Sequence, residues 1–209
     1  MCCGIKVKID IMEKYELIKE YFYKYEKYGI QKCDNGATLV GHPDYLLPNW
    51  WLVEFYTTLS TSDIECLEEQ LGQKLPEEYA EFVSHVSNGL IWQWGTFSIY
   101  GLRKSYARGV DASRLPFSIL TPNVDELCLI KNAKNSCFFI GGYNFDGSKL
   151  YIDKMTNKVH YCARYDATPL YTWNSMEEML ISEMTRLHSL YTENGRLLGE
   201  SEKVTLPNY

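Results

Sequence analysis

The chain has 209 residues, of which 45% are apolar and 23% charged, with a formal net charge of −6. This composition is typical of a soluble globular protein long enough to bury its own core, and it excludes a disordered chain. No apolar run approaches the roughly 20 residues of a membrane-spanning helix, and the opening MCCGIKVKID lacks the longer apolar segment of a secretory signal, so we expect a cytoplasmic protein.

The first predicted helix covers residues 10–28, where apolar side chains recur at spacings of four and three residues until Gly29. We expect this short helix to pack against its own domain. Residues 30–50 contain Asn35-Gly36 and two steps before proline, so turns and short extended pieces are predicted there. The dense apolar run from Trp50 to Tyr56 is expected to be core beneath the next helix.

Two short amphipathic helices follow in the most informative stretch of the chain. The first should begin at Ser62, with Glu65 completing a capping box, and end at Gly72 in a left-handed conformation. The second should have Pro76 in its first turn, where the missing N–H has no partner to lose. We expect Asn88-Gly89 to end this second helix.

The second half of the chain is richer in strand signals. An aromatic strand is predicted through residues 92–100, and residues 103–116 should form a surface loop. Three further strands are expected at residues 136–141, 149–153 and 158–164, and Asn174 or Ser175 should cap a last helix before a tail to Tyr209. This order predicts an α+β fold, an antiparallel sheet with helices packed on one side.

A set of spaced positions in the two predicted helices resembles the N-terminal signature of the SUKH superfamily, the Smi/Knr-like proteins. Leu90 follows where the family often has a second glycine. The resemblance covers roughly residues 60–191, and it implies the same α+β fold. We expect residues 1–59 to be an N-terminal helical elaboration packed on the main domain, and residues 60–209 to be a SUKH-like domain with a C-terminal helix and tail. The positions that carry the resemblance are Ile64, Glu68, Gly72, Leu75-Pro76, Tyr79, Phe82 and Asn88-Gly89.

The acidic imbalance is confined to the same two helices. Residues 61–82 contain seven acids and one base, a net of −6, so the remaining 20 acids and 20 bases cancel. Several of these acids lie in first helical turns, where the helix dipole favours them. Glu68, Glu69 and Glu81 do not, and they predict a surface that repels nucleic acid and suits a basic protein partner. A solvated helix face is the alternative.

The sequence offers few groups with catalytic or metal-binding spacing. His160 and Cys162 would point to one face of a strand, but no further catalytic motif accompanies them, so a structural role is favoured over a Cys/His enzyme. The seven cysteines are scattered and odd in number, which favours reduced thiols. Neither a metal motif nor a nucleotide-binding glycine loop is present, so we expect no cofactor and no metal.

Protein binding fits the composition better, because 17 tyrosines and 5 tryptophans provide large, rigid contact area. Trp92 and Trp94 would share one strand face, and whether that face is core or exposed stays open. The candidate partner contacts outside the acidic helices are Trp92, Trp94, Tyr106, Asp111, Tyr165 and Asp166.

The resemblance also implies a function. Bacterial SUKH proteins are immunity proteins that bind and neutralise a cognate polymorphic toxin, often a nuclease, and eukaryotic relatives are regulatory interaction proteins in cell-wall signalling. We therefore predict a non-catalytic immunity protein that occludes a basic toxin domain and binds neither nucleic acid nor a membrane directly. A regulatory or scaffold protein on the same fold is the alternative.

Overall fold

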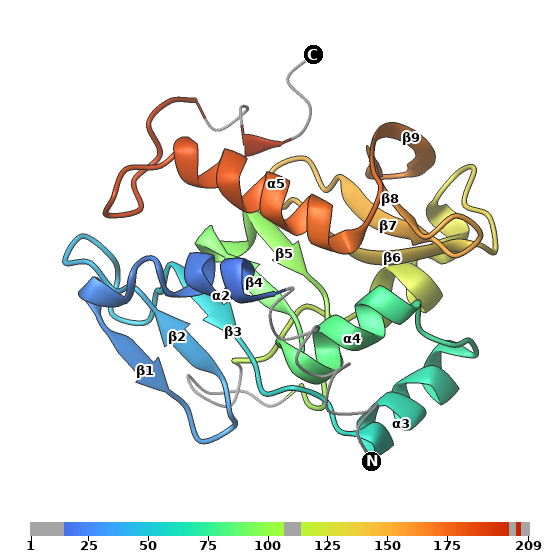
Figure 1. Ribbon diagram of the computed structural model, residues 1–209, viewed down its shortest axis with the longest axis horizontal. Coiled ribbons are helices and arrows are strands. Elements are labelled where there is room, and N and C mark those ends of the chain that lie inside the picture. Colours follow the sequence, from blue (N-terminus) through green and yellow to red (C-terminus); the bar gives the residue numbers. More distant parts are fainter. Residues whose placement is uncertain (1–14, 107–113, 201–203, 206–209) are drawn as a thin grey trace.

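The computed structural model describes residues 15–106, 114–200 and 204–205. Within these residues, nine strands form one sheet in which they lie in chain order and every neighbouring pair is antiparallel. The predicted α+β fold is thereby confirmed (Figure 1). The strands are β1 (Ile30–Lys32), β2 (Thr38–Val40), β3 (Val53–Phe55), β4 (Leu90–Trp92), β5 (Phe97–Ile99), β6 (Cys137–Gly142), β7 (Lys149–Asp153), β8 (Lys158–Ala163) and β9 (Asp166–Trp173).

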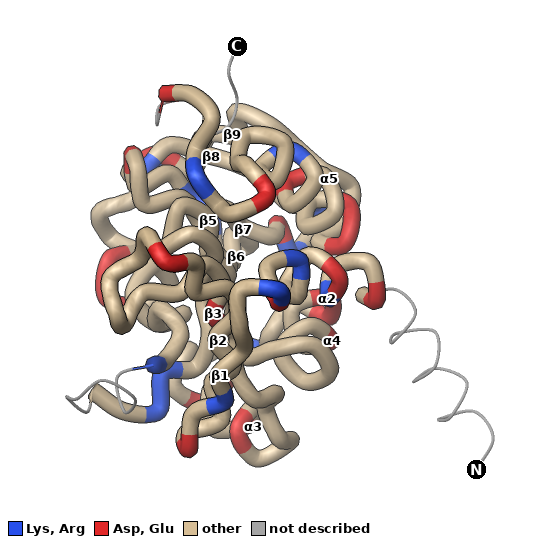
Figure 2. Tube along the Cα trace, turned by 90° about the vertical axis from the view of Figure 1, so that its left-hand side faces the viewer, with Lys and Arg blue, Asp and Glu red and all other residues tan. Residues whose placement is uncertain are grey.

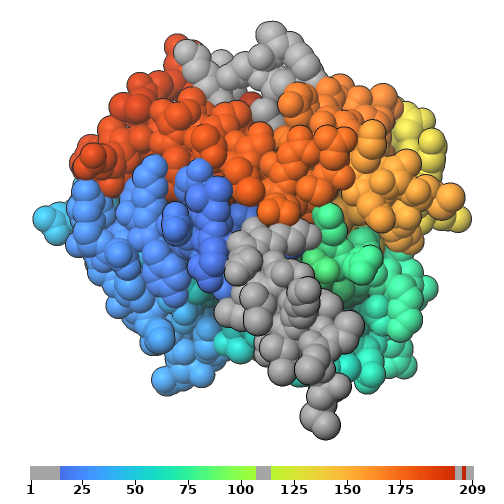
Figure 3. Space-filling view, in the orientation of Figure 1, coloured from blue at the N-terminus to red at the C-terminus, as the bar shows by residue number. Residues whose placement is uncertain are grey.

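Four α-helices in the described part of the chain cover one face of this sheet (Figure 1). They are α2 (Glu16–Tyr23), α3 (Thr61–Leu71), α4 (Glu77–His85) and α5 (Met176–Ser189). Figure 3 shows α5 and α2 side by side on the outer surface. None of these helices is long and apolar enough to span a bilayer.

The main core lies between these helices and the sheet, and it includes the inward faces of α2, α3, α4 and α5. The opposite sheet face carries two smaller apolar clusters, one around Phe139 and Tyr151 and one around Leu39 and Trp51. Loops cover parts of this second face, among them the short helical turns η3 (Thr121–Asp125) and η4 (Leu127–Leu129). On the sheet face away from the helices, loops and turns therefore form much of the molecular surface.

Local signals placed some helix ends correctly and missed others. Gly72 ends α3 at a φ of 64°, and Ser175 caps α5 by accepting a hydrogen bond from the Glu178 backbone N–H, as predicted. The predicted start of α3 at Ser62 with Glu65 is wrong. Ser60 is the cap, because its hydroxyl accepts from the Asp63 backbone N–H at 3.2 Å while the Asp63 carboxylate accepts from the Ser60 N–H at 3.0 Å.

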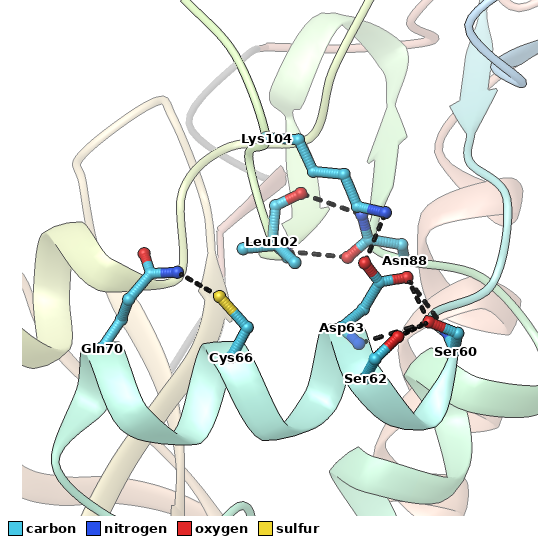
Figure 4. A network of polar contacts seen from close by, with 8 residues as sticks. All are labelled: Ser60, Ser62, Asp63, Cys66, Gln70, Asn88, Leu102 and Lys104. Carbon is cyan, nitrogen blue, oxygen red and sulfur yellow. Dashed lines mark hydrogen bonds and ion pairs between the residues drawn. The ribbon is translucent and has the colours of Figure 1, made fainter.

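Lys104 explains in part why Ser60 and not Ser62 caps α3. Its ammonium lies 2.7 Å from the Asp63 carboxylate and holds that carboxylate beside the helix end (Figure 4). The hydrogen bonds from Lys104 and from the Ser60 backbone lower the pKa of Asp63 to about 2. A long-range ion pair thus favours one of two overlapping capping patterns.

Asn88-Gly89 does not end α4, because that helix stops at His85. The Asn88 side chain instead bonds both backbone polar groups of Leu102: its Nδ2 donates to the carbonyl at 2.9 Å, and its Oδ1 accepts from the N–H at 2.7 Å (Figure 4). Gly101 passes so close that a Cβ there would lie 2.4 Å from the Asn88 carbonyl oxygen. This dipeptide therefore joins the entry to β4 to the segment after β5.

The predicted single aromatic strand is also wrong. The chain forms β4, a tight turn over Gln93–Gly95 (η2), and β5, which returns antiparallel with Trp92 paired to Phe97. Strand β9, which pairs with β8 through two register shifts, was not predicted. The meander of β6, β7 and β8 is confirmed.

The segment before α3 contributes to the same sheet. Residues 15–59 supply α2, the short turn η1 (Glu26–Tyr28) and strands β1 to β3, while the start of the predicted helix at residues 10–14 lies outside the described residues. The apolar run around residue 50 is only partly core: Leu52 and Val53 are fully buried, whereas Trp50 is 46% exposed. The division of the chain at residue 59 stays a prediction.

Candidate partner-binding surface

The acids of α3 and α4 are partly used within the fold. Glu68 is mostly buried, accepts a hydrogen bond from the Leu75 backbone N–H at 3.0 Å and pairs with Lys74 at 2.6 Å. The bond from Lys74 lowers the pKa of Glu68, so this carboxylate stays charged while it braces the turn between the two helices. Glu78 accepts from the Met176 backbone N–H at the start of α5.

Fewer acids are consequently exposed on α3 and α4 than the seven acids of residues 61–82 would suggest. Glu65 and Glu69 are exposed and border a shallow depression of about 460 Å³ on α3, whereas Glu81 is half-buried on α4. Figure 2 shows acidic positions on several elements with basic positions among them. The helices therefore contribute to a negative surface without forming a closed acidic site.

The two tryptophans expected to share a face are separated by the turn between β4 and β5. Trp92 is fully buried and its ring contacts Tyr191 and His188 in the core. Trp92 therefore has no exposed surface to offer a partner, which corrects its prediction as a contact. Trp94 is 40% exposed, because the chain reverses direction between these two residues.

The backbone of this turn is unusual for the residues it contains. Trp94 has φ 58° and ψ 28°, Gly95 has φ 91°, and the Thr96 N–H donates to the Gln93 carbonyl at 3.0 Å. Positive φ at both central residues is the pattern of a type I′ turn, which strongly prefers glycine, asparagine or aspartate. A bulky tryptophan in this conformation is strained.

The β6–β7 turn holds the strained turn in place. The Asn144 backbone N–H donates to the Gly95 carbonyl at 3.2 Å, and its Nδ2 donates to the Trp94 carbonyl at 3.3 Å. A Cβ at Gly95 would lie only 2.2 Å from Asn144 Nδ2, so no larger residue fits there without a shift. Phe145, the next residue, is 51% exposed.

Trp50 reaches the same surface from the loop before β3. Its ring centroid lies 5.4 Å from that of Trp94, at an interplanar angle of 51°. His42 bonds the Trp50 carbonyl at 2.7 Å, and Arg114 joins the neighbouring Asn49 carbonyl to the Glu54 carboxylate. We call Trp50 and Trp94 the tryptophan pair, and both of its loops are fixed by polar contacts.

The remaining predicted contacts lie on other turns. Tyr106 is 76% exposed beneath the Arg103 guanidinium, and Tyr165 is 46% exposed beside that of Arg164. Asp166 accepts hydrogen bonds from Asn132 and from the Thr168 backbone, which lower its pKa and identify it as a turn-forming carboxylate. Asp111 lies outside the described residues.

His160 and Cys162 do lie on β8, but their surroundings do not activate the thiol. Cys162 is fully buried, and burial raises its pKa to about 12. His160 Nδ1 lies 2.8 Å from the Thr172 hydroxyl, and its ring packs on Tyr151. A nucleophilic cysteine needs the opposite, a depressed pKa and access to substrate. Among the described residues, no three His, Cys, Asp or Glu side chains are grouped to hold a metal ion.

The sequence did not single out Trp50 or Phe145. A usable signal existed for Trp50, because it adjoins Trp51 in an extended segment, where successive side chains point in opposite directions. One of the two had to face outward, and in the structure that residue is Trp50, since Trp51 is 9% exposed.

Comparison with known proteins agrees with the sequence pattern and the fold. The family model for the SMI1 / KNR4 family (SUKH-1) matches residues 58–182, more than half of the chain and the span from just before α3 to the middle of α5. No curated protein and no solved structure matches the chain. The protein belongs to the SMI1/KNR4 family (SUKH-1).

Proposed function

We propose that this protein is a non-catalytic immunity protein that binds and neutralises a cognate polymorphic toxin domain by occluding it. SUKH-1 is a family associated with immunity to such toxins. The observation that carries the proposal in this chain is the tryptophan pair, two exposed rings 5.4 Å apart on loops held by polar contacts.

Strain at Trp94 supports a binding role. A bulky residue in the left-handed region costs about 1–3 kcal/mol, and such strain concentrates at functional sites. Glycine would relieve it, because glycine adopts positive φ freely. Because Trp94 leaves 40% of its surface exposed, burial of the ring offsets this strain only in part in the free protein. Binding to a partner would supply the missing gain.

The pair also has the properties of an interface anchor. Tryptophan is enriched among the residues whose truncation costs about 2 kcal/mol or more at interfaces. The loops are already ordered by His42, Arg114 and Asn144, so little conformational entropy would be lost on binding. A preorganised aromatic pair therefore suits tight occlusion of a folded partner.

The acidic helices would act at longer range. Exposed acids on α3 and the net charge of −6 would steer a basic toxin domain towards the protein, which affects association rate more than affinity. Glu69, Glu81, Tyr106, Tyr165 and Asp166 remain proposed flanking contacts. Glu68 contributes chiefly by bracing α3 against α4.

The test is co-expression with the toxin domain encoded beside this protein. Wild type should rescue growth and co-purify with the toxin in a complex that weakens with salt. Trp94→Gly and Trp50→Ala should each weaken binding by about tenfold or more, because each removes one member of the pair. Tyr171→Ala is the matched control, since Tyr171 is 45% exposed on β9.

The outcomes separate the candidate functions. Continued toxin activity with wild type, without a complex, contradicts the immunity role. A stable complex with a housekeeping protein and no protection would support the scaffold alternative. Equal loss of binding in all three variants would show that the tryptophan pair has no special role.

A further inference from the structure

A pocket of about 250 Å³ opens beside the Trp94 turn on the sheet face away from the helices. Its lining includes Tyr100, Phe117, Asn144 and Lys149. A Cβ at Gly95 would lie 2.2 Å from Asn144 and 3.1 Å from Phe117, so the turn that carries Trp94 packs directly on two residues of the pocket wall. We call this cavity the Lys149 pocket.

Lys149 is an unusual residue to find in such a wall. Its side chain is 9% exposed, and its Nζ lies 3.8 Å from the Glu126 carboxylate, beyond hydrogen-bond distance. Burial lowers the pKa of Lys149, and the nearby Arg164 lowers it further, whereas Glu126 raises it. Buried ammonium groups require close acceptors, and within the described residues Glu126 is the only carboxylate within 4 Å.

The other groups around Lys149 do not provide its ammonium with a second negative charge. Cys162 lies opposite Lys149 in the β7–β8 register, but burial raises the pKa of that thiol to about 12, so it carries no countercharge. Burial likewise raises the pKa of Tyr100, which keeps its phenol protonated and able to donate. In the described part of the chain, that hydroxyl donates to no protein acceptor. Two donors of this kind in one pocket are suited to a carboxylate.

We propose that the Lys149 pocket receives an acidic side chain of the partner protein, whose carboxylate binds the Lys149 ammonium and the Tyr100 hydroxyl while the tryptophan pair covers the adjoining surface. This inference rests on the proposed partner-binding function and names the chemistry of that contact. One inserted carboxylate also fits a partner that is basic overall, because net charge acts at long range and the pocket acts on contact.

The size of the pocket favours a protein side chain over a free metabolite. Pockets for small molecules typically measure roughly 300–1,000 Å³, and this one is smaller. The two turns that border the pocket carry the exposed residues Trp94 and Phe145, so a partner that fills the pocket can also gain apolar contact near it. Such a ring of contacts excludes water from a central polar anchor, as in known interface hot spots.

The test uses calorimetric titration of the full chain with the toxin domain that co-purifies with wild type. Lys149→Met should weaken the complex by about tenfold or more, because it leaves the partner carboxylate unpaired. Glu126→Gln should have the opposite effect, tightening binding by about threefold or more, because the competing negative charge is gone. Lys158→Met, an exposed lysine on β8, is the matched control and should leave the dissociation constant unchanged.

A scan of acidic residues in the toxin domain then identifies the inserted side chain. One Asp→Asn or Glu→Gln substitution should reproduce the loss seen with Lys149→Met, and the two changes together should cost little more than either alone. A thermal melt of each free variant checks folding. If Lys149→Met is unfolded, the tightening by Glu126→Gln decides the question alone.

The results distinguish this inference from the proposed function. Unchanged binding by folded Lys149→Met, or by Glu126→Gln where the first variant does not fold, overturns the pocket assignment while the immunity role stands. Failure of wild type to bind any toxin domain removes the proposed function and this inference with it.

Discussion

Acidification should destabilise this protein through His188, a histidine in the core between α5, α2 and β4. His188 is 5% exposed, its ring stacks on Tyr21 with centroids 5.1 Å apart, and it also contacts Tyr25 and Trp92. Its Nδ1 lies 3.4 Å from the Tyr25 hydroxyl, and within the described residues its Nε2 is buried without a hydrogen-bond partner. The Tyr21 backbone favours an imidazolium here, but burial of the ring opposes it more strongly.

Burial, reinforced by the nearby Lys24, lowers the pKa of His188 to about 3 from an ordinary value of 6.5. Between those two pH values the unfolded chain binds a proton that the folded chain does not, so stability is full above pH 6.5 and falls as the pH drops. Each unit of difference is worth about 1.4 kcal/mol, so lowering the pH from 7.5 to 4.5 should cost about 2–3 kcal/mol through this residue.

Urea unfolding of wild type and His188→Phe at pH 7.5 and 4.5 measures this contribution. Other titrating groups are common to both proteins, so their effects cancel in the comparison. The free energy of unfolding should fall by about 2–3 kcal/mol less in the variant than in wild type. His85→Gln, which removes an exposed histidine, serves as the control and should follow wild type. Equal losses in wild type and His188→Phe would refute the reasoning.

Three further predictions follow from buried contacts and backbone strain. Asn88→Leu should lower the free energy of unfolding by about 2–5 kcal/mol in urea titrations, because it strands two buried backbone groups of Leu102; a change below 1 kcal/mol would contradict this role. Trp94→Gly should weaken partner binding yet have a free energy of unfolding about 1 kcal/mol higher than that of Trp94→Ala, because both variants lose the ring and its contact with Trp50 but only glycine relieves the positive φ; equal stabilities would mean that the turn is not strained. Peptide mapping after brief thiol alkylation should find exposed Cys66 labelled in the native protein and Cys162 labelled only in denaturant; rapid native labelling of Cys162 would revive the Cys/His enzyme.

Short-range signals predicted much of the fold. The end of α3 at Gly72, the cap of α5 at Ser175 and the strand over residues 149–153 depend on backbone geometry and side-chain alternation within a few residues. The family signature is also local, because the spacing of its residues reflects two helices and the turn that joins them. Its Asn88 serves a different purpose from the predicted helix end, since its partner Leu102 lies 14 residues later.

The candidate partner-binding surface was harder to predict from the sequence than the fold was, because the exposure of a side chain depends on how the whole molecule packs. A continuous aromatic strand and a hairpin are both compatible with the residues around Trp94, and only pairing of β4 with β5 reverses the chain there. Glu68 likewise reads as a surface acid until Lys74 and the Leu75 backbone are placed beside it.

The sequence by itself determined the class of the protein: an α+β chain with the SUKH signature, rich in aromatic residues and with its acidic excess in two helices. Those properties depend on composition and on spacings of three or four residues, which are local. Tertiary structure decided which tryptophan is buried, which acids are already paired, and that Lys149 lines a pocket beside the turn that carries Trp94. These features depend on contacts between residues far apart in the chain. The physical reason is that the interior is close-packed, so only some side chains can be buried against the sheet.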